Sequence, residues 1–168
     1  MCRFVKRRGP YSAAMKIPPL KRGIEQAWLL VSPLPFPLNF ISVHAWCTVS
    51  DRHNATYRWE VWHRKLPAER RWGYIHRNLF APFRGIGLTP LTRSRCWQAS
   101  PLCYWEGECA RRLSRILAES ARTYPHFDRY LYWPGPNSNT YVQWILDRLP
   151  GKTVRLPERA IGSRFFIE

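Results

Sequence analysis

The sequence predicts an α+β domain in which a small antiparallel sheet packs against two or more helices. Apolar and polar residues alternate over residues 39–50 and 56–63, as they do in half-buried strands. Apolar residues recur at helical spacing over residues 108–123, and a second such pattern follows a turn rich in proline and glycine. An apolar fraction of 45% and nine tryptophans argue against disorder. We therefore expect one globular domain over residues 24–168, preceded by a flexible basic arm over residues 1–23.

The first strands are expected soon after the arm. Residues 26–32 are a short strand candidate, and the stiff, proline-rich residues 33–37 join it to a longer strand over residues 39–50. One face of this longer strand holds Ile41, Val43, Ala45, Cys47 and Val49, and it predicts core contacts. The opposite face is mixed and carries His44, so it predicts a cleft or a packed helix. A turn leads into residues 56–63, which predicts a hairpin with the longer strand.

The remaining elements follow in order along the chain. Residues 72–80 are a candidate third strand, and residues 81–100 are rich in turn formers. The helix over residues 108–123 has an apolar stripe that comprises Cys109, Leu113, Ile116, Leu117 and Ser120. Residues 130–133 are expected to be extended. The irregular tail, residues 153–166, is expected to cap the core.

The most distinctive segment runs from Trp133 to Tyr141, with the sequence WPGPNSNTY. Its prolines and glycine predict a tight, rigid turn, and Asn137 or Ser138 then caps a helix. The apolar residues of that helix are Val142, Ile145, Leu146 and Leu149, and Pro150 with Gly151 ends it. Because a helix N-terminus presents unpaired N–H groups, this turn suits an anion or a developing oxyanion.

The same segment resembles the signature of a bacterial family of uncharacterised proteins, domain of unknown function 3750. Three other stretches resemble that family in the same order: residues 40–46 with their His-Ala-Trp, residues 106–110 with the turn at Tyr124-Pro125, and residues 156–162. The resemblance covers roughly residues 26–168. The family has no established activity, so the resemblance implies little chemistry.

A second, more distant resemblance carries more chemistry. Residues 137–141, Asn-Ser-Asn-Thr-Tyr, are similar to the Asn-Cys-Asn-x-aromatic helix start of permuted papain-like proteins of the NlpC/P60 type. Those proteins place a histidine on an early strand and a cysteine at the start of a later helix. His44 and Ser138 stand in that order, with serine where cysteine is usual. The resemblance implies a permuted papain-like fold and a hydrolase or acyltransferase that acts on amide or ester bonds.

Each catalytic candidate also has a plain structural interpretation. Ser138 is either a nucleophile or a helix-entrance serine, and His44 is either its general base or a packed, hydrogen-bonded histidine. In the permuted families a polar residue on the next strand orients the histidine. Glu60 is the first candidate for that role and His63 the second. Glu60 could instead form a cross-strand salt bridge with one of the many arginines.

Other residues are expected to complete or line the site. Asn137 and Asn139 are candidates to donate to an oxyanion or to fix the turn. Trp46, Trp133 and Tyr141 are candidates to line a cleft. The five cysteines include no Cys-x-x-Cys pair, and the histidines show no ligand spacing. We therefore expect neither a metal nor a cofactor. Cys96 and Cys103 either bridge a loop or, as we favour, stay reduced.

The net charge of +16 predicts an anionic partner or a solvated basic surface. Ten basic residues and two acidic ones lie in residues 52–95, where they alternate with Trp59, Trp62, Trp72 and Tyr74. The second functional hypothesis is thus a catalytically inactive basic domain that binds nucleic acid or an anionic envelope surface. The sequence shows no clear signal peptide or transmembrane segment, so we expect a cytoplasmic protein or one peripheral to a membrane.

Overall fold

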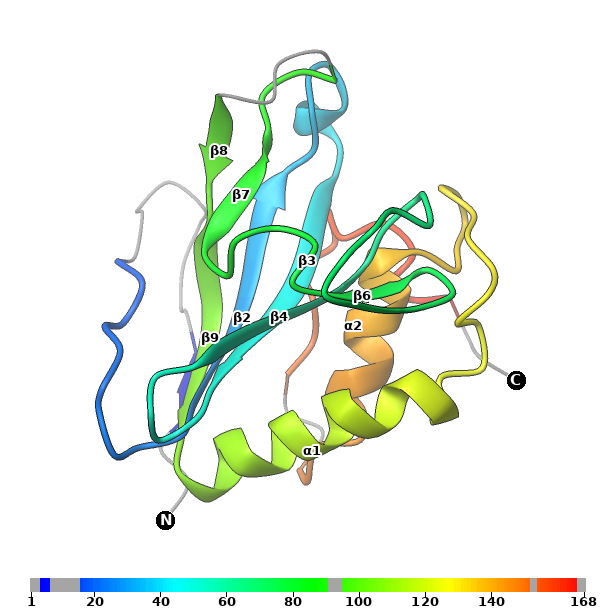
Figure 1. The fold of residues 1–168 in the computed structure, drawn as a ribbon. Coiled ribbons are helices and arrows are strands. Elements are labelled where there is room, and N and C mark those ends of the chain that lie inside the picture. Colours follow the sequence, from blue (N-terminus) through cyan, green and yellow to red (C-terminus); the bar gives the residue numbers. More distant parts are fainter. Residues whose placement is uncertain (1–3, 7–15, 91–94, 152–153, 166–168) are drawn as a thin grey trace.

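The computed structural model describes residues 4–6, 16–90, 95–151 and 154–165. An antiparallel sheet forms the centre, two helices pack on one of its faces, and a short two-stranded ribbon lies over the other (Figure 1). The sheet has seven strands in the order β1-β9-β2-β3-β4-β6-β5. The predicted α+β class, with an antiparallel sheet against two helices, is confirmed.

The strands of the main sheet differ widely in length. The longest are β2 (Gln26–Pro33), β3 (Val43–Ser50), β9 (Ser100–Glu106) and β4 (Thr56–Val61). The short strands β5 (Arg70–Trp72) and β6 (Ile75–Arg77) extend one edge, and β1 (Phe4–Lys6) pairs with β9 at the other. The ribbon consists of β7 (Arg84–Gly87) and β8 (Cys96–Gln98).

Strand β3 lies in the middle of the sheet and is buried along its whole length. It pairs with β2 over eight residues, whereas β4 pairs with it only from Cys47 to Ser50. The predicted hairpin of the two strands is therefore present. The first half of β3, which carries His44, pairs with β2 on one side but is not paired with β4 on the other. Its second edge can therefore contact other parts of the chain.

The two faces of the sheet contact different parts of the molecule. Val43, Ala45, Cys47 and Val49 belong to the main core beneath the helices, as their alternation predicts. The opposite face of β3 was expected to meet a cleft or a helix. Instead its Trp46 packs with Trp28, Leu30, Ala99 and Tyr104 in a second cluster, because the segment around Phe83 covers this face.

Helix α1 (Glu108–Thr123) has the predicted bounds. Its buried residues are Ala110, Leu113, Leu117 and Ser120, at helical spacing. Helix α2 (Ser138–Leu146) is buried at every position and lies across β3 and β4. The two helices meet where the Ser120 hydroxyl and the Tyr141 hydroxyl lie 2.8 Å apart.

Several local predictions are corrected by the structure. Residues 38–40 form the short 3-10 helix η1 (Leu38–Phe40) rather than the start of β3, because Pro37 immediately precedes them. The single strand expected over residues 72–80 is a tight hairpin of β5 and β6, with Gly73 in the left-handed region at φ +57°. Helix α2 ends at Leu146, one turn before the predicted Leu149.

The C-terminal segment caps the core, as predicted. Val154, Leu156 and Ala160 are buried in the main core, and the Leu156 N–H donates to the Gln143 side-chain oxygen at 2.9 Å. Of the expected basic arm, residues 4–6 form β1 and residues 16–23 are described, and the other residues of the arm lie outside the described ranges. Within the described ranges, none of the helices combines the length and apolar character needed to cross a bilayer.

Candidate functional site

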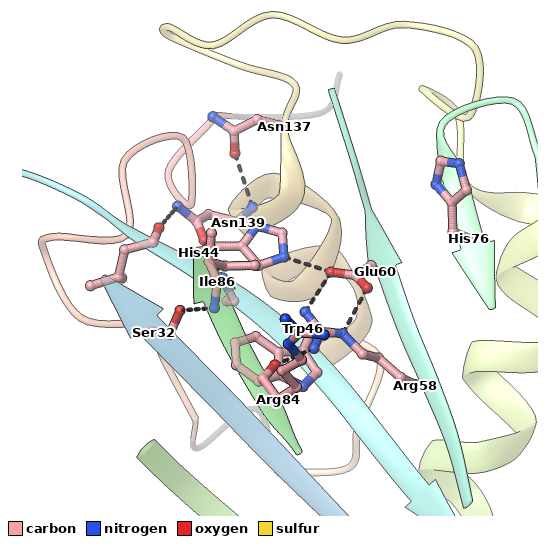
Figure 2. Close-up of polar contacts among 12 residues, drawn as sticks. Ser32, His44, Trp46, Arg58, Glu60, His76, Arg84, Ile86, Asn137 and Asn139 are labelled. Carbon is pink, nitrogen blue, oxygen red and sulfur yellow. Dashed lines mark hydrogen bonds and ion pairs between the residues drawn. The ribbon is translucent and has the colours of Figure 1, made fainter. Parts of the chain in front are cut away.

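His44 and Glu60 form a buried pair on neighbouring strands. Nε2 of His44 lies 2.8 Å from Oε2 of Glu60, and the two side chains are 4% and 0% exposed (Figure 2). His44 is on β3 and Glu60 on β4, both on the face turned away from the helices. The structure thus brings together two of the three residues that are predicted from the sequence to be catalytic.

Arg58 holds the other side of the Glu60 carboxylate. Its Nη2 donates to Oε2 at 2.8 Å, and its Nε lies 2.6 Å from Oε1. The guanidinium also donates to the carbonyls of Ala81 and Arg84 and stacks 4.1 Å above the ring of Trp46. Figure 2 shows Glu60 between the imidazole and the guanidinium. The carboxylate is therefore held in a single orientation, which in turn orients His44.

Burial and charge set the protonation states of this triad. Burial would raise the pKa of Glu60, but the charge of Arg58 and the hydrogen bond from His44 bring that pKa below its usual value. Burial lowers the pKa of His44, and Glu60 offsets this only in part. At neutral pH the carboxylate is charged and the imidazole neutral, so Nε2 carries the proton and Nδ1 the lone pair. Nδ1 is bonded to none of the residues that the structure describes.

Asn139 joins the start of α2 to the half of β3 that β4 does not cover. Its Oδ1 accepts from the Ala45 N–H at 3.1 Å, and its Nδ2 donates to the Val43 carbonyl at 2.9 Å. The same Nδ2 donates to the Ile161 carbonyl at 2.9 Å. The amide therefore imitates a neighbouring strand, and it contacts the backbone on both sides of His44.

Asn137 is the N-cap of α2. Its Oδ1 accepts from the N–H groups of Asn139 at 2.9 Å and Thr140 at 3.2 Å, and the Thr140 hydroxyl accepts from the Asn137 N–H in return. Its Nδ2 donates to the carbonyls of Tyr132 and Ile161. The side-chain donors of both asparagines are thus used to hold the turn and the strand. Neither side chain keeps a free N–H for an oxyanion in this arrangement.

Ser138 lies between these two asparagines, at the first position of α2, and is 5% exposed. Because Asn139 contacts the backbone beside His44, the Ser138 backbone is one residue from that contact. Within the described part of the chain, no hydrogen bond joins Ser138 Oγ to His44. The Ser138 N–H is likewise bonded to no residue that the structure describes.

The three residues proposed to line a cleft occupy different surroundings. Trp46 is fully buried, and its Nε1–H donates to the Pro82 carbonyl at 3.0 Å. Tyr141 is fully buried in the main core. Trp133 is 76% exposed on the loop before α2. His63, the second candidate to orient His44, makes ring contacts with Trp62, Tyr130 and Tyr132, whereas its neighbour Trp62 meets His44 edge to face.

Two hollows of about 300 Å³ and 350 Å³ lie away from the His44 pair. The first lies between α1 and the β3–β4 turn, beside Glu25, Tyr57 and Arg111. The second lies between α1 and the end of α2, beside Trp105, Arg112 and Leu149. Neither is lined by His44, Glu60 or Ser138, so a molecule bound in either hollow would not touch these three side chains.

The described residues give no sign of a metal site or of a Cys96–Cys103 bridge. Among them no group of three or more His, Cys, Asp or Glu side chains could hold a metal ion. Cys47, Cys96 and Cys103 are in no disulfide. Cys109 is disulfide-bonded.

Two functional roles were missed from the sequence. Arg58 is two residues before Glu60 on the same strand, so the shared face was readable, but so many arginines surround it that none stood out. The contact of Asn139 with β3 had no sequence signal, because it depends on where α2 packs against the sheet.

Comparison with known proteins identifies the family alone. No curated protein and no solved structure matches the chain. The model of the family described as "Protein of unknown function (DUF3750)" matches residues 36–165, well over half of the chain and including His44, Glu60 and the α2 turn. The chain therefore belongs to the DUF3750 family.

Proposed function

We propose that this protein is a hydrolase or acyltransferase of the Ser–His type, acting on amide or ester bonds on a permuted papain-like scaffold. The observation that carries the proposal is the 2.8 Å contact between His44 Nε2 and a buried, ionised Glu60. The buried ion pair of Arg58 and Glu60 beside His44 costs desolvation energy, and such costly arrangements are concentrated at functional sites. The neutral imidazole has its proton fixed on Nε2, which leaves Nδ1 as the basic atom.

In this proposal Ser138 is the nucleophile and His44 the general base. Ser138 Oγ forms a bond to the substrate carbonyl carbon and gives its proton to His44 Nδ1. Glu60 stabilises the imidazolium through Nε2–H. The imidazolium then returns the proton to the leaving amine or alcohol as its bond to carbon breaks. Water or a second acceptor removes the acyl group from Ser138 by the same route.

The proposal requires a rearrangement at the start of α2. Ser138 Oγ must approach Nδ1 to hydrogen-bond distance, a contact that often forms only when substrate is bound. The Ser138 N–H is the remaining donor of the first turn for an oxyanion, since Asn137 Oδ1 occupies the N–H groups of Asn139 and Thr140. The asparagines then act by positioning the helix and the strand.

Labelling with a fluorophosphonate probe tests the proposal. We expect the wild type to be labelled, Ser138→Ala to lose all labelling, and His44→Ala to lose roughly a hundredfold or more in labelling rate. Ser114→Ala, half-buried on α1 beside the first hollow, is the matched control and should label like the wild type. Wild-type protein that is folded but unlabelled by fluorophosphonate and acyl probes would contradict the proposal.

A cysteine at the same position tests the scaffold separately. In a papain-like arrangement Ser138→Cys creates a thiol beside His44, so its pKa should fall and its alkylation rate near neutral pH should rise. The same replacement at Ser114 gives the reference rate for an ordinary thiol. Equal alkylation rates of the two thiols would count against the papain-like comparison.

The second candidate is a catalytically silent domain that binds an anionic partner. It is favoured by the fully used amides of Asn137 and Asn139 and by the missing bond between Ser138 Oγ and His44 within the described residues. Together with the +16 charge, these contacts suit a scaffold kept for binding. This candidate predicts no covalent labelling, and binding that weakens steeply as salt increases.

A further inference from the structure

Exposed apolar side chains gather on two loops of the molecule. Of the ten large apolar side chains that are exposed among the described residues, seven belong to residues 36–41 or 131–133. These seven are Phe36, Leu38, Phe40, Ile41, Leu131, Tyr132 and Trp133. Phe40 is 70% exposed and Trp133 76% exposed, so these rings contribute little to the core. Singly exposed apolar residues need no explanation, but a concentration of this kind marks an interaction surface.

The two loops lie at the same end of the fold. The Arg159 side chain donates to the Asn39 carbonyl, and the Arg159 carbonyl accepts from the Val43 N–H at 3.1 Å. Two residues later, the Ile161 carbonyl accepts from Nδ2 of Asn137, which also donates to the Tyr132 carbonyl. The segment from Arg159 to Ile161 therefore joins the loops. In Figure 1 the loop before β3 lies at the top of the view, and the yellow loop that leads into α2 lies to its right. We call these seven residues the apolar rim.

The backbone under the rim is well held. The Phe36 N–H donates to the Leu88 carbonyl and the Leu131 N–H to the Pro136 carbonyl, both at 2.8 Å. The ring of Tyr132 contacts those of His63 and Tyr130. The exposed side chains are therefore presented by a fixed framework, which reduces the entropy lost on binding.

The charges around the rim are mainly positive. The basic residues of these and neighbouring segments are Arg64, Lys65, Arg129, Arg159 and Arg164, against the acidic residues Asp128 and Glu158. Asp128 pairs with Lys65, and Glu158 lies 3.6 Å from Arg164. Both acids are thus compensated, and Arg64 and Arg129 add positive charge in the segments next to the rim, which suits an anionic partner.

We infer that the apolar rim docks the protein on the surface of an anionic lipid bilayer. Tryptophan, tyrosine and phenylalanine with flanking arginines are the side chains that favour the headgroup region. Leu38, Ile41 and Leu131 favour lipid over nucleic acid, because aliphatic side chains cannot stack on bases. Docking in this orientation turns the start of α2, with Ser138, toward the membrane. The inference goes beyond the proposed function and does not require Ser138 to be catalytic.

Vesicle co-sedimentation tests the inference. Full-length protein is mixed with phosphatidylcholine vesicles, either pure or with roughly a third of phosphatidylglycerol, at low and high salt. We expect binding to the anionic vesicles to exceed binding to neutral ones by at least about tenfold. The double variant Phe40→Ser/Tyr132→Ser should lose about tenfold or more of the binding at every salt concentration, because the lost contribution is apolar.

The control is a matched change away from the rim. Leu20 and Ile24 are 41% and 38% exposed and precede β2, so Leu20→Ser/Ile24→Ser should bind vesicles like the wild type. Equal thermal unfolding midpoints of the two double variants would show that each is folded. Equal binding by both would overturn the inference. Binding of single-stranded oligonucleotides that competes with vesicles, together with insensitivity to the rim variant, would assign the charge to nucleic acid instead.

Labelling separates this inference from the proposed function. The Ser138→Ala variant should lose fluorophosphonate labelling and still bind anionic vesicles. The rim variant should keep its labelling in solution and lose vesicle binding. Failure of one pair of measurements thus leaves the other proposal standing.

Discussion

Asn139 holds His44 in place by bonding the backbone on both sides of it, at the Val43 carbonyl and the Ala45 N–H. This relationship connects the N-terminus of α2 to the middle of the sheet through one short side chain. It explains how residues that are 94 and 96 positions apart in sequence meet at distances of about 3 Å. It also supplies a direct test of the arrangement.

Replacing Asn139 by alanine should destabilise the protein markedly. The change leaves the Val43 and Ile161 carbonyls and the Ala45 N–H with lost hydrogen bonds in a buried place. We expect the free energy of unfolding in urea to fall by about 3 kcal/mol or more. Asn39→Ala is the control, because Asn39 Oδ1 is buried without a partner among the described residues. Equal losses in the two variants would contradict this role of Asn139.

The Arg58–Glu60 pair should show strong coupling in a double-mutant cycle. Glu60→Gln leaves a buried guanidinium without its counter-charge, and Arg58→Met leaves a buried carboxylate, so each change should cost roughly 3–5 kcal/mol. The double variant should cost less than the sum of the two, because no unpaired charge remains. Urea unfolding of the four proteins measures this coupling. Additive losses would mean that the two charges stabilise the fold independently.

Acid should destabilise the protein from about pH 6.5 downward. Burial lowers the pKa of His44 and of His76 below the ordinary value of 6.5. As the pH falls, the unfolded chain therefore binds protons before the folded chain does. The stabilisation from the two neutral histidines is complete above pH 6.5, and the free energy of unfolding falls as the pH drops below 6.5. Urea unfolding at about pH 7.5 and about pH 5.5 measures the difference.

His44→Gln isolates the part of this acid sensitivity that His44 contributes. The glutamine amide can still donate to Glu60 but does not titrate, so the fall in stability on acidification should be smaller than in the wild type. The exposed His53 provides the control, since His53→Gln should leave the fall unchanged. A fall of the same size in the His44 variant would exclude His44 as a source of the pH dependence.

Gly162 should tolerate alanine less well than Gly23. Both have positive φ, +89° and +81°, so alanine strains the backbone at each. A Cβ on Gly162 would lie 2.3 Å from Nδ2 of Asn137, whereas a Cβ on Gly23 meets nothing within 4 Å. We expect about 1 kcal/mol of destabilisation for Gly23→Ala and at least twice that for Gly162→Ala. Thermal unfolding of both variants provides the comparison, and equal losses would mean that the helix cap is insensitive to crowding.

The sequence is informative where contacts are local or follow strand alternation. The bounds of α1, the β3–β4 hairpin and the core face of β3 were all predictable from residue spacing. The contact of His44 with Glu60 was predictable because both lie on the same face of neighbouring strands. Glu60 was predicted either to orient His44 or to form a salt bridge with an arginine across the sheet. It contacts His44, and it also pairs with an arginine, although this is Arg58 on the same strand.

Contacts that depend on distant packing were not predictable. Strand β9 was missed because Pro101 breaks its pattern, and it pairs with β2 some 75 residues earlier, with a register shift at Leu29/Leu30. The covering of the His44 face by the segment around Phe83 and the ribbon of β7 and β8 arises from the path of a long turn-rich stretch. No periodicity within that stretch indicates where it folds back.

The burial of β3 makes the Cys47 thiol a chemical reporter of sheet opening. Burial, with a smaller effect of Cys103, raises the pKa of Cys47 to about 12, so the thiolate is scarce in the native state. Iodoacetamide therefore modifies Cys47 only when β3, the strand that carries both His44 and Cys47, detaches from the sheet. The rate of modification then reports how often β3 detaches. A ligand that binds to His44 and Glu60 should slow the alkylation of Cys47 in proportion to its occupancy. Alkylation rates can therefore be used to screen for substrates without assuming any reaction.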